Sequence, residues 1–170
     1  IIQQYYEHFN ILSIIFVTKK NRIYPIKMSL SRRLIFGVFK RKIYDRLLEW
    51  KGKSNGSTAM LIDGARRVGK SWLCKQFAEH EYRSHIVIDF GNAPEEILDL
   101  FLHESSNLDL FFAKLSVYYS TPLHRRESVI IFDEVQQFPR ARQLIKYLVA
   151  DGRYDYLETG SLIRLKKNVQ

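Results

Sequence analysis

Cysteine is almost absent from this chain of 170 residues, which contains only Cys74. A single thiol cannot form an internal disulfide, and it has no companion for a metal site, so a disulfide-stapled framework and a cysteine-ligated zinc site are both excluded. The five histidines also show no metal-ligand spacing. We therefore expect Cys74 to be a buried thiol in a protein of a reducing compartment, the cytoplasm.

Long apolar runs are absent as well. The apolar stretch at residues 9–17 contains Asn10 and Ser13 and falls well short of the roughly 18 residues that a membrane span needs. No basic region precedes it and no small-residue cleavage site follows it, so it is a poor signal peptide. The chain has no methionine before Met28. We expect translation to start there and residues 1–27 to be a non-native or disordered leader.

Negative charge is scarce at the start of the chain only. Residues 1–53 hold 12 Lys and Arg against three acidic residues, whereas residues 54–170 hold 15 of each. The net charge of +9 therefore resides in the N-terminal part. The segment 28–53 is predicted to be a basic helical segment. Its ordinary interpretation is a solvated helix, and the alternative is an arm that contacts nucleic acid, an anionic membrane surface or a protein partner.

Short apolar runs alternate with helical patterns through the rest of the chain. Strands are predicted at residues 58–63, 85–90, 128–134 and 154–161, and segments with helical periodicity separate them. This alternation predicts parallel βαβ units in an α/β fold, a three-layer sandwich with a mostly parallel sheet. Residues 54–170 are long enough for one such core. A helix before it, starting near residue 40, carries an apolar stripe of Ile43, Leu47 and Trp50.

The sequence "GARRVGKS" interrupts good core sequence and fits the pattern G-x-x-x-x-G-K-[ST]. In this pattern backbone N–H groups curl round a phosphate, Lys70 reaches the outer phosphates and the Ser71 hydroxyl holds Mg²⁺. The alternative is an incidental glycine turn, which leaves three cations unexplained at the positive end of a helix. The candidate nucleotide-binding residues are Gly64, Ala65, Arg66, Arg67, Val68, Gly69, Lys70, Ser71 and Trp72.

Two further polar groups follow predicted strands. "VIIFDE" carries Asp133 to the carboxyl end of a strand, where it is a candidate Mg²⁺ ligand together with Ser71. Glu134 comes next and is a candidate base that orients and deprotonates a water. "LETGS" ends the following strand, and either Thr159 or Ser161 is a candidate polar group that bonds the attacking water or the terminal phosphate. Spacing alone does not separate these two.

Together, "GARRVGKS", "IIFDE" and "LETGS" resemble the AAA-type P-loop ATPases. More narrowly, the chain from about residue 38 is similar to the little-characterised prokaryotic AAA-like ATPases that carry a C-terminal domain of unknown function. The resemblance implies that Lys70 contacts phosphates, that Ser71 and Asp133 hold Mg²⁺, and that Glu134 is the catalytic base. It also implies ATP as the nucleotide and the possibility of an oligomer.

Mg²⁺-dependent ATP hydrolysis is accordingly the first functional hypothesis. A P-loop kinase for a small molecule is a second, and it has less need of a glutamate beside the metal-binding aspartate. A GTP switch is a third, and the chain lacks an Asn-Lys-x-Asp sequence for reading guanine. A basic DNA-binding module with a regulatory nucleotide site is the fourth.

The end of the sequence leads to one more expectation. In this architecture a fifth strand flanks the strand of the phosphate loop, and residues 162–170 are too few and too charged to supply it. We therefore expect an incomplete sheet with the strand around residues 60–62 exposed at its edge, which invites pairing with other chains. The chain is predicted to be an aggregation-prone fragment that is nearly inactive as an ATPase.

Overall fold

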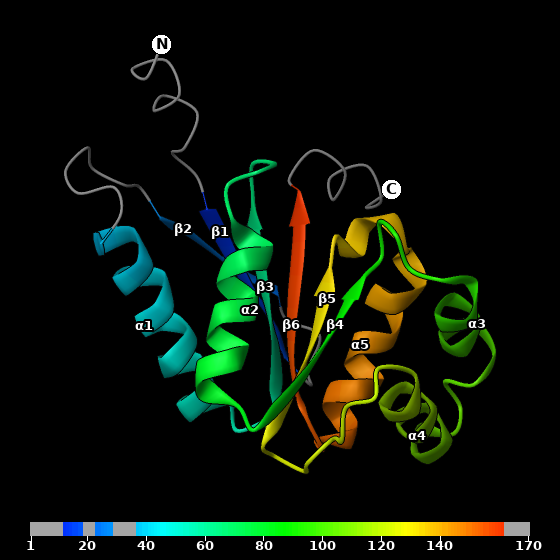
Figure 1. Cartoon of the computed structure of the whole chain (residues 1–170). Helices are drawn as coiled ribbons and strands as arrows, with labels where there is room; N and C mark the ends of the chain where they lie inside the picture. The colour runs from blue at the N-terminus through cyan, green and yellow to red at the C-terminus, as the bar shows by residue number, and fades with distance from the viewer. Residues whose placement is uncertain (1–11, 19–22, 29–36, 162–170) are drawn as a thin grey trace.

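The structure, a computed structural model, describes residues 12–18, 23–28 and 37–161, with side chains from residue 43 onward. The described residues form strands, α-helices and one short 3₁₀ turn (Figure 1). In chain order these are β1 Leu12–Thr18, β2 Ile23–Met28, α1 Gly37–Ser54, β3 Thr58–Gly64, α2 Lys70–Glu81, β4 Ser84–Asp89, α3 Glu95–His103, α4 Leu108–Tyr118, β5 Ser128–Asp133, η2 Val135–Gln137, α5 Pro139–Asp151 and β6 Asp155–Ser161.

The strands form one sheet in the order β2-β1-β3-β6-β5-β4. The four strands from β3 to β4 in this order are mutually parallel, and β1 and β2 join them as antiparallel neighbours. The predicted α/β fold with a mostly parallel sheet is therefore confirmed. Because parallel strands end at the same edge, Gly64 lies opposite Ser161 and Asp89 opposite Asp133 in the register. This edge gathers the predicted polar groups.

Helices cover both faces of the parallel part of the sheet, as the sandwich prediction requires. In Figure 1, α1 and α2 lie on one side of the sheet, and α3, α4 and α5 lie on the other. Each face has its own apolar core. The predicted stripe of α1 is buried against the α2 side, with Ile43 and Leu47 1% exposed and Trp50 2% exposed.

The expectation that β3 forms an exposed sheet edge is wrong. β1 pairs with it in antiparallel register, so that Ile62 lies opposite Ile14 and Met60 opposite Phe16. The prediction places the missing strand after β6 and leaves residues 1–27 outside the fold. Residues 12–18, however, are rich in the β-branched and aromatic types that favour strands. Because β1 covers this edge, the argument from a bare β3 to an aggregation-prone and nearly inactive fragment loses its basis.

The segment predicted to be a leader, residues 1–27, includes β1 and nearly all of β2. Residues 1–11 and 19–22 lie outside the described residues, but residues 12–18 and 23–28 are ordered as a paired β1 and β2. The assignment of residues 1–27 as a non-native or disordered leader stays a prediction. The basic segment 28–53 contains most of α1, and residues 29–36 lie outside the described part, as do residues 162–170.

Candidate functional site

The segment that carries the phosphate-loop motif connects the end of β3 to the start of α2. Gly69 is the residue that caps α2, with a φ of +86°, a left-handed conformation that glycine adopts without steric cost. It supplies no side-chain acceptor to the first turn of the helix, and that turn contains no acidic residue. A helix N-terminus of this kind favours an anion, because its N–H groups and its dipole both present positive charge.

Lys70 lies at the first position of α2 and is only 5% exposed. Its ammonium reaches back across the loop, where Nζ donates to the carbonyl of Ala65 at 2.8 Å and to that of Gly64 at 3.2 Å. The side chain is thus held within the loop by backbone groups. A buried lysine there brings positive charge to the start of the helix.

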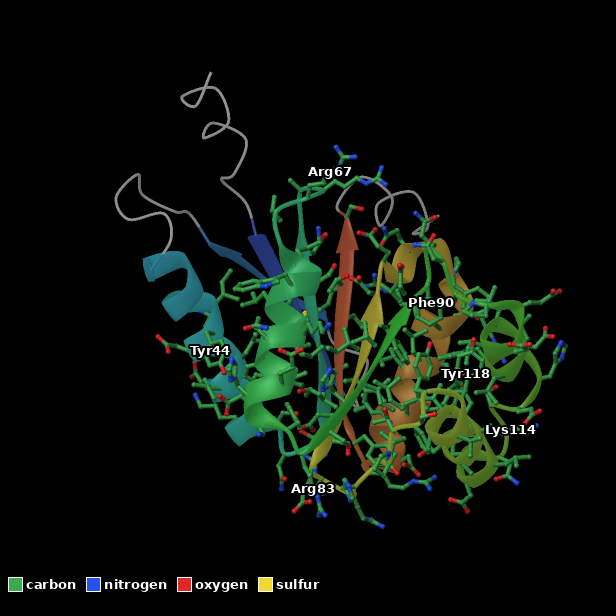
Figure 2. All side chains as sticks on the ribbon, viewed as in Figure 1. Tyr44, Arg67, Arg83, Phe90, Lys114 and Tyr118 are labelled. Atoms are coloured by element: carbon green, nitrogen blue, oxygen red, sulfur yellow. The ribbon has the colours of Figure 1, made fainter. Side chains whose placement is uncertain are left out.

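Arg66 and Arg67 are both exposed, in contrast to Lys70. Arg67 adopts a left-handed φ of +64°, and Figure 2 shows it at the outer tip of the loop. Trp72 directly follows Ser71 and is 56% exposed. The loop therefore combines one buried cation with two outward-facing ones.

Asp133, at the end of β5, accepts hydrogen bonds from two hydroxyl groups on other elements. Ser71 on α2 donates to Oδ1 at 2.7 Å, and Thr159 on β6 donates to the same oxygen. The Ser71 hydroxyl and the Asp133 carboxylate both offer oxygen atoms, the ligand type that Mg²⁺ prefers, and they lie side by side. Within the described residues no group of three or more His, Cys, Asp or Glu gathers for a metal. The pair fits Mg²⁺, which usually takes few protein ligands and keeps several waters.

Thr159 is fully buried and has both of its hydrogen-bonding roles in use. Besides donating to Asp133, its Oγ1 accepts from the backbone N–H of Glu134 at 3.1 Å. The single hydroxyl proton of this side chain is therefore directed at Asp133. Ser161, two residues on, is partly exposed and makes neither of these bonds. The two residues that spacing left equivalent occupy different environments.

Glu134 begins a sharp change of direction after β5. Its φ of +52° is left-handed, which is uncommon for a residue other than glycine and is found where surrounding structure enforces it. The 3₁₀ turn η2 follows immediately. The Glu134 carboxylate accepts a hydrogen bond from Nε2 of Gln136, and this nitrogen also donates to Ser161 Oγ at 3.1 Å. Sequence reasoning missed Gln136, although a glutamine two residues after the acidic pair was visible.

Two buried carboxyl groups were also missed, one next to the loop and one in the middle of β6. Asp63 precedes the phosphate loop, and its Oδ1 accepts from the N–H of Gly64 at 2.8 Å. It is 2% exposed, and burial raises the pKa of its carboxyl. Glu158 on β6 is fully buried, and neither carboxylate oxygen has a hydrogen-bond partner among the described residues. Burial raises the pKa of Glu158 to about 7, against the opposing effect of Arg142 on α5.

A protein-family model matches more than half of the chain. The model of the protein family described as "AAA domain" matches residues 56–170. No curated protein matches the chain, and no solved structure does. None of the helices in the described ranges combines the length and the apolar character needed to cross a bilayer. The matched range contains the phosphate loop and the ends of β5 and β6.

Proposed function

The chain belongs to the AAA domain family, and on that premise we propose that it binds ATP with Mg²⁺ and hydrolyses it. Family membership indicates a nucleotide-binding, ATPase-like domain in general. The single observation that supports hydrolysis is the arrangement around Asp133. Ser71 and Thr159 donate to one oxygen of its carboxylate, and the next residue, Glu134, has a left-handed backbone conformation. This arrangement separates a metal-binding carboxylate from a second carboxylate that is available to a water.

The loop binds the phosphates in this proposal. Backbone N–H groups at the start of α2 and the ammonium of Lys70 receive the negative charge, and Lys70 exchanges its two loop carbonyls for phosphate oxygens. Ser71 and Asp133 hold Mg²⁺, which neutralises charge on the phosphates when it is bound. Trp72 and the backbone of the remaining loop residues line the nucleotide, while the side chains of Arg66 and Arg67 face outward.

Glu134 acts on the water. Its carboxylate accepts a hydrogen bond from the water and takes its proton as the oxygen attacks the terminal phosphorus, and the bond to the leaving diphosphate oxygen breaks. Ser161 bonds the terminal phosphate or the water, because the proton of Thr159 is committed to Asp133. Thr159 instead orients Asp133 and the backbone of Glu134. Catalysis then comes from positioning and charge neutralisation, without a covalent intermediate.

The test is release of inorganic phosphate from ATP by the full chain, measured with Mg²⁺ and with a chelator, and repeated with GTP. We expect phosphate release that requires Mg²⁺, prefers ATP and disappears in Lys70→Ala. Arg83→Ala, at an exposed ion pair with Glu127 at the end of the molecule opposite Arg67 (Figure 2), is the control and is expected to retain the rate. Binding without any phosphate release would refute hydrolysis and favour a kinase that awaits its acceptor.

Contact of the basic N-terminal segment with nucleic acid or a protein partner is a separate proposal. The positive charge of residues 1–53 supports it. Two lysines of α1 already have partners within the fold, since Lys53 pairs with Glu49 at 2.5 Å and Lys51 lies 4.1 Å from the ring centroid of Tyr82. Duplex DNA binding that weakens steeply with salt would support the nucleic-acid partner, and binding that ignores salt would oppose it. A cytoplasmic location is proposed on the single buried thiol of Cys74.

A further inference from the structure

The turn η2 places a glutamine between two groups of the proposed active site. It spans Val135–Gln137 and is closed by a hydrogen bond of 2.8 Å from the N–H of Gln137 to the carbonyl of Glu134. Val135 is fully buried in the apolar core on the side of α5, which anchors the turn. The backbone of Gln136 is therefore fixed relative to β5 and β6.

The side chain of Gln136 is 7% exposed, and its amide nitrogen has two acceptors. One is the Glu134 carboxylate, on the preceding strand end, and the other is the Ser161 hydroxyl, on β6. The nitrogen carries two hydrogens, so both bonds form at once. The amide is oriented with its nitrogen, and not its oxygen, facing the Glu134 carboxylate, whose oxygen accepts the hydrogen bond.

The two hydrogen bonds from Gln136 form a bridge between Glu134 and Ser161, and burying this glutamine costs free energy that an apolar side chain would not. Oε1 of Gln136 is buried and has no hydrogen-bond partner among the described residues. A methionine or leucine would fill a similar volume without removing an amide oxygen from water. The glutamine contributes what these apolar side chains lack, which is a pair of donors aimed at two different elements.

Both bridged groups keep the atoms that the reaction needs. The hydrogen bond engages Oε2 of Glu134, while no described residue is bonded to the other carboxylate oxygen. Ser161 Oγ acts as an acceptor toward Gln136, so its own proton is directed elsewhere. A base with one oxygen available and a hydroxyl with its proton available are thus tied to the same amide.

We propose that Gln136 is a positioning residue that couples Glu134 to Ser161, so that the group acting on the water and the group bonding the terminal phosphate are aligned together. The inference rests on the proposed function, since Glu134 and Ser161 take these roles only in hydrolysis. In this proposal Gln136 acts through these two groups and makes no contact of its own with the nucleotide.

The first experiment reads the bridge in the full chain without nucleotide. The side-chain amide signals of Gln136 in a ¹⁵N-labelled sample are assigned by their loss in Gln136→Met. We expect slowed hydrogen exchange at this amide, and a shift of its two proton signals when Glu134→Ala or Ser161→Ala removes an acceptor. If the Gln136 side-chain amide instead has the chemical shifts of a solvent-exposed amide, and neither variant changes them, the inference is overturned, whatever the ATPase activity.

The second experiment separates binding from turnover. For Gln136→Met we expect kcat for ATP hydrolysis to fall about tenfold or more while nucleotide affinity stays within about twofold, because the lost contacts align the reacting groups and do not bind substrate. Gln76→Met, the same change at a glutamine that bonds Glu79 on α2, is the control and should leave both quantities unchanged. Adding Ser161→Ala to Gln136→Met should cost much less than Ser161→Ala alone, because the pair acts as a unit.

The outcomes distinguish a failure of the proposed function from a failure of the inference alone. If the wild-type chain shows the bridged amide but releases no phosphate, the proposed function fails and the coupling role fails with it. If the wild type hydrolyses ATP and Gln136→Met does so at the same kcat, only the inference fails. Should Gln136→Met not fold, as judged by its thermal transition, Gln136→Glu replaces it. This variant has the same shape but, when ionised, cannot donate to Glu134, and it must show the same loss of kcat.

Discussion

Ser71 on α2 donates a hydrogen bond of 2.7 Å to Asp133 at the end of β5, across 62 positions of sequence. The contact joins the phosphate loop to the neighbouring part of the sheet edge. Thr159 donates to the same carboxylate oxygen from β6. One carboxylate therefore connects three elements, and its charge and its geometry can be tested separately.

The charge of Asp133 is tested by Asp133→Asn, which keeps an oxygen able to accept from Ser71 and Thr159. We expect the Mg²⁺ concentration needed for half-maximal hydrolysis to rise about tenfold or more, because a neutral amide is a weaker ligand for a hard cation than a carboxylate. Nucleotide binding in the presence of a chelator should change little. An unaltered Mg²⁺ dependence in titrations with a fluorescent nucleotide and in phosphate release would remove Asp133 from the metal site.

Lys70 and Glu134 should differ in the step that they affect. Lys70→Ala is expected to abolish nucleotide binding, because the ammonium stabilises phosphate charge in the ground state and in the transition state alike. Glu134→Gln is expected to keep binding and lose hydrolysis by about a hundredfold or more, because its carboxylate takes the proton of the water only during reaction. Binding is measured by calorimetry and hydrolysis by phosphate release. A Glu134→Gln protein with wild-type turnover would end the assignment of this residue as base.

Thr159 and Ser161 should separate in stability. Thr159→Val keeps the shape of the side chain but removes the donor to Asp133 and leaves the N–H of Glu134 without its acceptor. We expect a loss of about 1–3 kcal/mol in the free energy of unfolding, the usual cost of leaving such a group unsatisfied. Ser161→Ala should change stability little and lower kcat. Urea unfolding of both variants checks this, and equal stability effects would contradict the division of roles.

Glu158 should make stability depend on pH. Its pKa is about 7 in the folded chain and near 4.5 when exposed, so the unfolded chain ionises first as pH rises. Between these values the unfolded state binds fewer protons, and stability therefore falls with increasing pH until the folded pKa is passed. The loss is on the order of 3 kcal/mol at pH 8 relative to pH 4, since each pKa unit is worth about 1.4 kcal/mol.

Glu158→Gln has the same shape and no charge, and it tests this dependence. We expect it to match the wild type near pH 4 and to be the more stable protein at pH 8, as measured by urea unfolding at both values. Glu79→Gln, at an exposed position of α2, is the control and should keep the wild-type pH dependence. A wild-type minus Glu158→Gln difference that does not grow with pH would show that the buried carboxyl does not titrate in this range.

Local sequence patterns were sufficient for the parallel part of the fold. The continuous apolar runs of β3 and β5 mark strands buried on both faces, and the phosphate loop lies between a strand and a helix as its chemistry requires. The spacing of Ile43, Leu47 and Trp50 likewise follows one face of α1. These features depend on residues close together in sequence, where periodicity is informative.

The features that sequence did not reveal depend on partners distant in the chain. Pairing of β1 with β3 joins residues that are 40 to 50 positions apart, and no turn signal links them. The bridge from Gln136 to Ser161 spans 25 positions and depends on the order in which β5 and β6 lie in the sheet. A glutamine in a polar turn has no distinguishing periodicity. Its role becomes visible only when the two strand ends are adjacent in space.

The place of β6 in the sheet has a consequence for how the chain acquires its structure during synthesis. Of the described strands it is the latest in sequence, yet it lies between β3 and β5 and pairs with both. Until residues 155–161 leave the ribosome, β3 and the β4–β5 pair are two separate units, each with an open apolar edge. The sheet is therefore completed in one late step, when β6 inserts between β3 and β5. Such non-local pairing is slow, and until it occurs the open edges can pair with other nascent chains.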